Sequence, residues 1–217
     1  MMKINLSILL IFMALISGCS WFGAEEREMN KSAKELAIQG SIEFRDKDYK
    51  KAIKSFTDLK DWYPFSQYAI LAELKIADAQ YKLEEYEDAR ASYETFESFH
   101  PENEAVPYVI YKTAMCWYNR IESVDKDQTP AKKALDQFRR LSIRFPQDAH
   151  TKLAQKRIKR CLESLAEHEE YVAKFYLKGE KYKAALKRFE EIFALYPDTD
   201  AGKRALENIA LCQKMLM

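Results

Sequence analysis

The residue types that carry most enzymatic chemistry are present in this chain, but their spacing does not assemble a site. The three histidines, His100, His150 and His168, stand far apart and form no metal-ligand pattern. The sequence contains no H-E-x-x-H pair, no G-x-S-x-G nucleophile motif and no glycine-rich phosphate loop. We therefore expect no catalytic residues, no metal site, no cofactor and no enzyme activity, which leaves binding as the function.

One cysteine is placed for a covalent modification. Lys3 precedes an apolar run from Leu6 to Ile16, which has the length of a signal-peptide core and is too short to span a bilayer stably. The run ends in Ile16-Ser17-Gly18-Cys19, and small residues before a cysteine at this place resemble the bacterial lipoprotein signal. The resemblance implies cleavage before Cys19 and acylation of Cys19. Several acyl chains hold a protein on a membrane far more firmly than one does.

The residues around this cysteine also indicate a destination. Ser20 follows Cys19 where an aspartate could stand, and in Gram-negative lipoproteins this resembles the pattern for export to the outer membrane. We expect residues 1–18 to be a signal peptide. Residues 19–32 would be the lipidated cysteine and a short tether, anchored in the inner leaflet of the outer membrane on its periplasmic face. An ordinary secretory signal with an incidental cysteine is the alternative.

The other three cysteines are Cys116, Cys161 and Cys212. Each falls within an expected helix, so we interpret each as a small buried hydrophobic residue. A disulfide between two of them stays open, because the periplasm is oxidising.

The rest of the chain follows a repeated pattern that would position the binding residues. A small residue is followed four positions later by an aromatic ring, and eight positions after the ring by a proline. This occurs at Ala52, Phe56 and Pro64; at Ala89, Tyr93 and Pro101; at Ala134, Phe138 and Pro146; and at Ala185, Phe189 and Pro197. Small residues let two helices approach closely, and proline ends the second helix because it lacks an N–H. Such a helix pair buries its apolar face only by stacking on neighbours.

The spacing resembles the tetratricopeptide (TPR) repeat. We predict an all-α fold, a right-handed TPR superhelix (α-solenoid) of four full repeats plus a C-terminal half-repeat. N-terminal repeats would cover residues 33–130 and form a substrate groove, and C-terminal repeats would cover 131–217 and bind a partner. A charged insert around residues 121–130 is either a functional loop or a solvated spacer. The apolar spacing predicts one long helix from about Asp148 to Leu177, ended by Gly179.

Several sequence strings point to a family. Tyr63-Pro64-Phe65 follows the first unit, and Asp125-Lys126-Asp127 precedes an alanine-rich helix. The fourth unit carries Arg188-Phe189-Glu190 and Tyr196-Pro197-Asp198-Thr199. With the lipoprotein signal and the repeat count, these strings resemble the BamD family of outer-membrane assembly lipoproteins, also called the ComL or YfiO type. The resemblance covers essentially the whole chain.

The resemblance implies a lipid-anchored scaffold subunit of the β-barrel assembly (BAM) complex. Its C-terminal repeats would bind the periplasmic POTRA domains of BamA, and its N-terminal repeats would receive unfolded outer membrane proteins. Other BAM subunits would be further partners. The alternative is a TPR lipoprotein that acts as a secretin pilotin or a cell-envelope coordinator. A net charge of +1 gives no reason to expect a nucleic acid partner.

We expect substrate on the first helix of each repeat, because these helices line the concave side of a TPR fold. Aromatic walls with basic groups suit an extended peptide that ends in an aromatic residue and a carboxylate. The alternative is that individual rings pack between repeats. The candidates are Phe44, Arg45, Phe65, Tyr81, Tyr108, Tyr111 and Tyr118, with Lys75, Lys82 and Lys112 nearby.

One further residue is a candidate for partner binding. Arg188 falls where the BamD family has an arginine in its R-x-E string, so the resemblance implies that it contacts BamA. A guanidinium can donate two parallel hydrogen bonds to a carboxylate, which lysine cannot copy. The alternative is an intramolecular pair with Glu191 or Glu207, which would contribute little to stability.

Overall fold

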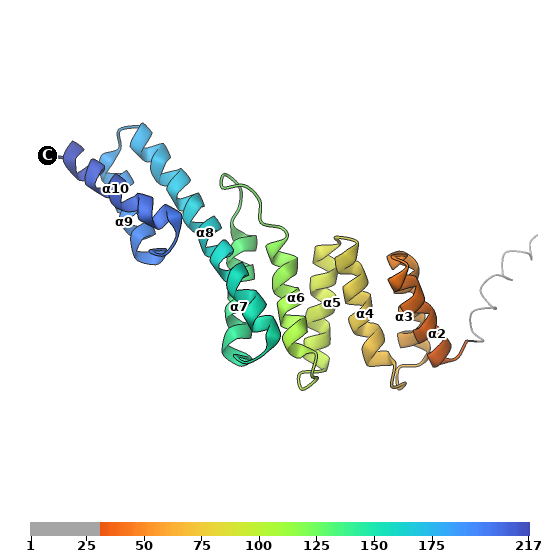
Figure 1. Cartoon of the computed structure of the whole chain (residues 1–217). Helices are drawn as coiled ribbons and strands as arrows, with labels where there is room; N and C mark the ends of the chain where they lie inside the picture. The colour runs from red at the N-terminus through yellow and green to blue at the C-terminus, as the bar shows by residue number, and fades with distance from the viewer. Residues whose placement is uncertain (1–30) are drawn as a thin grey trace, which may run out of the picture.

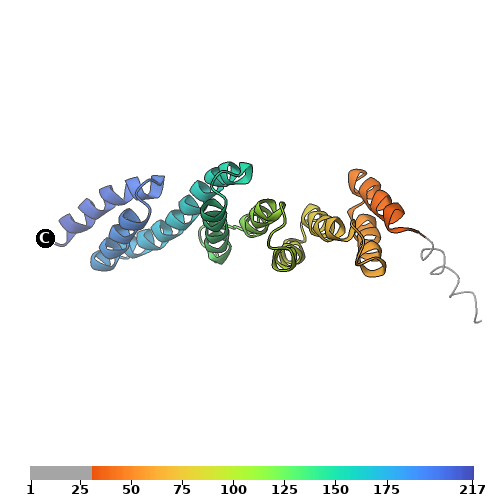
Figure 2. The same cartoon turned by 90° about the horizontal axis from the view of Figure 1, so that it is seen from below.

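The computed structural model describes residues 31–217, and this part of the chain folds into helices without strands. Each helix packs on the next in the sequence, so the molecule is an elongated row of antiparallel pairs (Figure 1). Figure 2 shows the whole length of the same row from below. The helices are α2 (Ala33–Arg45), α3 (Tyr49–Trp62), α4 (Ala69–Lys82), α5 (Tyr86–Phe99), α6 (Val106–Tyr118), α7 (Thr129–Arg144), α8 (Ala149–Lys178), α9 (Tyr182–Leu195) and α10 (Asp200–Met215).

The repeated positions explain this arrangement. The four slot alanines and the four slot rings, predicted to mediate close helix packing, are all fully buried. In the first unit the ring of Phe56 lies directly over Gly40, where an added Cβ would come within 2.8 Å of a ring carbon. The prediction of an all-α repeat solenoid that ends in a single first helix, α10, is therefore confirmed.

Three of the turns inside the helix pairs share one geometry. Lys47, Glu84 and Glu180 have positive φ, and the next residue donates its N–H to a carbonyl five positions earlier, as from Lys181 to Tyr176 (3.0 Å). This is the hydrogen bond of a Schellman helix end. Gly179 ends α8 as predicted, but its φ is −85° and the left-handed residue is Glu180.

The long helix α8 confirms the predicted span and connects the two halves of the solenoid. Asp148 caps its start by accepting a hydrogen bond from the N–H of His150 (2.7 Å). Ala154 and Cys161, in the first half of α8, belong to a core cluster shared with α6 and α7. Ala166 and Ala173, in the second half, belong to a cluster shared with α9 and α10. One rigid helix therefore serves two adjacent cores.

The insert of the third repeat forms the loop between α6 and α7, and it is held against α8. The Nδ1 of His168 lies 2.6 Å from the carbonyl oxygen of Val124. Gln128 is 4% exposed; it donates to the carbonyls of Ser123 and Lys126 and accepts from the hydroxyl of Ser164. The loop is thus anchored in the fold at two points.

The division of roles at residues 130 and 131 stays a prediction. It falls in the first turn of α7, and one core cluster, including Val106, Ala131 and Leu165, extends across it. Cys116, Cys161 and Cys212 are buried and free, as interpreted from the sequence. None of the helices within residues 31–217 has the length and apolar character needed to cross a bilayer. The predicted signal peptide, Cys19 and nearly all of the tether lie outside the described residues.

Candidate functional site

The first helices of successive units meet through side chains on one side of each helix. We call this surface the first-helix face; it is formed by α2, α4, α6 and the first half of α8. The Nζ of Lys75 on α4 lies 5.0 Å from the ring centroid of Phe44 on α2. Tyr108 on α6 donates to Asp78 on α4 (2.5 Å), and the ring of Tyr111 lies 5.6 Å from that of His150 on α8. Of the predicted residues, Phe44, Lys75, Tyr108 and Tyr111 therefore connect four helices into one surface.

The N-terminal end of this face holds a hollow of about 380 Å³ between α2 and α4. Its apolar part includes Ile38, Ile42 and Leu71, which are each 43–50% exposed. Lys34 and Arg45 add positive charge, although Arg45 also lies 3.5 Å from Asp46. Of the predicted residues only Arg45 lines the hollow. Sequence reasoning missed the aliphatic residues of this hollow. The available signal was the spacing of Ile38 and Ile42, which lie four residues apart on α2 and outside its buried positions.

Asp78 is the central acceptor of the face. It is 7% exposed; its Oδ1 accepts from the hydroxyls of Tyr93 (2.7 Å) and Tyr108 (2.5 Å), and its Oδ2 lies 3.3 Å from the Nζ of Lys75. Burial, followed by the charge of Asp78, raises the pKa of both tyrosines, so they stay protonated donors. The hydroxyl of Tyr108 is committed to this network, and its ring lies edge-on against Tyr93 and His150.

Tyr81 carries a cation on its ring. The Nζ of Lys112 lies 3.1 Å from the ring centroid, and the hydroxyl of Tyr81 accepts from the amide of Asn119 (2.8 Å). Cation–π contacts of this kind strengthen when they are shielded from water. Burial lowers the pKa of Lys112 to about 8, while the charge of Asp78 acts in the opposite direction.

The remaining rings on α6 are half-buried. Tyr111 and Tyr118 both lie against Phe138, with centroids 5.8 and 6.2 Å away. The guanidinium of Arg157 lies 4.9 Å from the ring of Tyr118 and donates to its hydroxyl (3.4 Å). These rings thus pack within their own unit on α7 and contact α8 of the next unit. Phe65 is apart from them, because it is fully exposed in the turn between α3 and α4.

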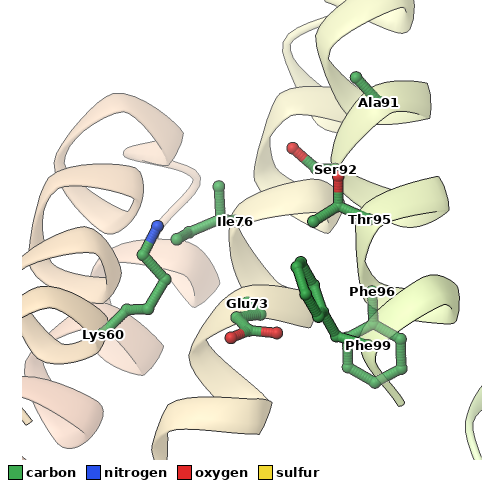
Figure 3. A pocket seen from close by; sticks show the side chains of 8 residues that line it. All are labelled: Lys60, Glu73, Ile76, Ala91, Ser92, Thr95, Phe96 and Phe99. Atoms are coloured by element: carbon green, nitrogen blue, oxygen red, sulfur yellow. The ribbon is translucent and has the colours of Figure 1, made fainter. Parts of the chain in front are cut away.

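A second hollow lies on the other side of α4 (Figure 3). It measures about 310 Å³, and it collects residues from α3, α4 and α5. Its acidic group, Glu73, is already within 2.8 Å of the Nε2 of His100. Phe99 stands at its edge and is 74% exposed. No predicted residue lies here. The lining residues are Lys60, Glu73, Ile76, Ala91, Ser92, Thr95, Phe96 and Phe99.

Arg188 lies on α9, far along the solenoid from these hollows (Figure 1). Its Nη1 donates to the Oε2 of Glu169 on α8 (3.0 Å), and its guanidinium lies 5.4 Å from the ring of Tyr176. Arg188 therefore pairs within the chain with Glu169, and not with Glu191 or Glu207 as the alternative interpretation expected. The side chain remains 36% exposed, which leaves part of the guanidinium accessible.

The residues described by the structure contain no cluster of three or more histidine, cysteine or acidic side chains able to hold a metal ion. Cys116 and Cys161 are poor nucleophiles, because burial raises the pKa of each thiol to about 12. The chemistry that the first-helix face offers is contact with rings, aliphatic groups and anions.

Comparison with known proteins gives relatives by sequence over most of the chain. The chain is 27% identical to the outer membrane protein assembly factor BamD of Vibrio cholerae over 91% of this chain and 86% of that protein. It is 26% identical to the protein of the same name from Neisseria gonorrhoeae over 93% and 80% of the two chains. Among solved structures, the TPR2AB domain of yeast Sti1 in its pHSP90 complex superposes with a TM-score of 0.49 at 16% identity, covering 85% and 71%.

The family model of YfiO, described as outer membrane lipoprotein, matches residues 29–216. This span includes every helix from α2 to α10 and leaves out only Met217 at the end of the described residues. It also includes Tyr63-Pro64-Phe65 and Arg188-Phe189-Glu190, the strings that suggested the family. This chain belongs to the YfiO family of outer membrane lipoproteins.

Proposed function

We propose that the protein is a subunit of the outer-membrane β-barrel assembly complex and acts as a scaffold rather than an enzyme. The observation that carries this proposal is the similarity, over about nine-tenths of the chain, to proteins named outer membrane protein assembly factor. Lipidation of Cys19 would hold it on the periplasmic face of the outer membrane. An elongated solenoid suits this role, because its surface is large relative to its mass and different units can bind different partners.

The first-helix face is the proposed binding surface for unfolded outer membrane proteins. The hollow between α2 and α4 offers aliphatic side chains to an apolar residue of the substrate. The rings and cations on α4 and α6 follow along the same face. An extended chain with alternating apolar residues can contact such a surface through several weak sites at once.

The C-terminal repeats are the proposed binding surface for the POTRA domains of BamA. Arg188 supports this assignment, since its guanidinium is partly exposed and can donate to a carboxylate of the partner besides Glu169. Other BAM subunits would use further parts of the solenoid.

Affinity purification from detergent-solubilised outer membranes tests the proposed function. We expect the full-length lipoprotein to retain a barrel protein that carries POTRA domains, identified by mass spectrometry of the bound material. Recovery of a secretin instead would contradict the proposal and support a pilotin. Mass spectrometry of the purified protein tests the anchor: a triacylated Cys19 at the N-terminus is expected, and a free N-terminus beyond Cys19 would exclude it.

A further inference from the structure

The cations of the first-helix face differ in how their charge is balanced. Lys75 lies 3.3 Å from a carboxylate oxygen of Asp78. Lys82, Lys112 and Arg157 form no salt bridge with any residue in 31–217. These three cations lie on the successive first helices α4, α6 and α8, and no acidic side chain of the described residues lies within salt-bridge distance of any of them.

Lys112 is the most shielded of these three cations. Its ammonium group lies on the ring of Tyr81, 3.1 Å from the centroid, and it is only partly accessible to solvent. Asp78 acts on it through space but forms no salt bridge with it, and the carboxylate oxygens of Asp78 contact Tyr93, Tyr108 and Lys75 instead. A shielded charge without a counter-charge is costly, and an anion that binds there regains this free energy.

From this arrangement we propose that Lys112 is the residue that binds a carboxylate of the polypeptide ligand, with Lys82 and Arg157 as flanking cations. The ring of Tyr81 lies under the ammonium group of Lys112, and Tyr111, the residue before Lys112 on α6, has its ring against His150 on α8. An aromatic or aliphatic side chain next to the ligand carboxylate would contact these rings. The inference rests on the proposed function of the first-helix face and adds to it the group that recognises the anion.

The charge of Lys112 also gives the binding a distinctive dependence on pH. Because its pKa is about 8, part of the population carries a neutral amine in mildly alkaline solution. A bound carboxylate favours the protonated form, so the preference for an acidic ligand should weaken as the pH rises above 8. Asp78 and Lys82 from α4 and Cys116 from α6 act on the charge of Lys112, and its ammonium group lies on the ring of Tyr81. The next titratable and charged groups contact these residues or other residues of α6: Tyr86 lies against Tyr81, Tyr93 and Tyr108 donate to Asp78, Arg90 lies on Trp117, and His150 and Arg157 from α8 lie against Tyr111 and Tyr118.

Binding of three synthetic peptides to the full-length protein in detergent tests the inference. The peptides share one extended apolar sequence ending in phenylalanine. The first has a free C-terminal carboxylate, the second a C-terminal amide, and the third the same amide with a glutamate beside the phenylalanine. Fluorescence anisotropy gives each dissociation constant. We expect the first peptide to bind about tenfold more tightly than the second, which corresponds to about 1.4 kcal/mol. The third distinguishes a side-chain carboxylate from a chain terminus.

The decisive variant is Lys112→Met, which keeps an unbranched apolar stem and removes the charge. The ratio of the dissociation constants of the amide and the free acid should fall from about tenfold to about onefold. Lys112→Arg should retain most of the preference. Lys133→Met, at an exposed position of α7, is the matched control and should behave as wild type.

The outcomes separate this inference from the proposed function. If Lys112→Met binds the amide normally and still prefers the acid tenfold, the carboxylate is bound elsewhere and the inference is wrong. If the wild-type protein binds none of the three peptides, both the peptide-binding role of the face and the inference are wrong. Membership of the assembly complex is tested separately, by affinity purification.

Discussion

The first-helix face of the N-terminal units and the junction of α8, α9 and α10 use charged residues in different ways. On the face, Lys112 and Arg157 lie on tyrosine rings and have no carboxylate partner among the described residues. At the C-terminal junction, Glu170 is 4% exposed and accepts from Arg204 (2.9 and 2.5 Å) and Lys174 (2.7 Å). Glu169 pairs with Arg188 in the same region. The N-terminal surface thus leaves two cations without a carboxylate partner, whereas the C-terminal charges join helices to one another.

The largest effect on stability is expected at the C-terminal junction. A Cβ added at Gly202 would lie 2.1 Å from the carbonyl oxygen of Tyr196, and backbone cannot move aside as a side chain can. Gly202→Ala should lower the free energy of unfolding by about 3 kcal/mol or more. Urea unfolding followed by circular dichroism measures it.

Gly179→Ala is the control for that substitution, because its Cβ would meet no atom closer than 3.5 Å and its φ is −85°. It should change stability by no more than about 0.5 kcal/mol. Equal effects of the two substitutions would contradict the close approach of α10 to the turn before it.

The corresponding test in the N-terminal units is a pair of substitutions on α5. Ala89 is fully buried against the neighbouring helix, and Ala91, two residues later, is exposed. Ala89→Phe overpacks the contact and should cost about 1–3 kcal/mol, whereas Ala91→Phe should be close to neutral. Ala52→Phe should resemble Ala89→Phe, since Ala52 is also fully buried. Unchanged melting curves for both buried variants would show that these slots are not close helix contacts.

A smaller effect is expected for the buried carboxylate at the junction. Burial raises the pKa of Glu170, but hydrogen bonds from Arg204 and Lys174 outweigh it and leave the pKa below its usual 4.5. Glu170→Gln should therefore cost about 1 kcal/mol at neutral pH, because Arg204 and Lys174 are partly exposed and screened by water.

The sign of the pH dependence follows from the lowered pKa. The contribution of Glu170 to the free energy of unfolding is complete above pH 4.5, the ordinary pKa of the group. It is lost as the pH falls through the lower pKa that Glu170 has in the folded protein. The difference between wild type and Glu170→Gln should thus shrink in acid. Glu207→Gln, at an exposed position of α10, serves as the control. A difference that stays constant down to pH 3 would contradict the ionic role of Glu170.

The smallest effect on stability is expected for Arg188→Ala. Its pair with Glu169 is partly exposed on both sides, so its loss should cost no more than about 0.5 kcal/mol. If Arg188 serves the partner, the folded variant will no longer retain BamA in affinity purification. Full co-purification of BamA with Arg188→Glu would limit the role of Arg188 to the pair with Glu169.

Local spacing in the sequence determined most of the fold. The slots of Ala52, Phe56 and Pro64 and their repeats predicted the helix pairs, because they encode close approach, a filling ring and a helix end over neighbouring residues. The 14 extra residues before Ala173 predicted the long α8, since they keep one helical phase. The same repeat spacing also placed the aromatic and basic candidates on the first helix of each unit.

Only the tertiary structure decided which charges are balanced and which are not. Asp78 accepts hydrogen bonds from tyrosine hydroxyls on α5 and α6. Arg188 pairs with Glu169 on another helix, and Gly202 faces the backbone of the preceding turn. The uncompensated charge of Lys112 depends on the same network. These features arise where helices from different units meet, and the distance between two side chains there is set by the packing of the helices and not by the spacing of the residues along the chain.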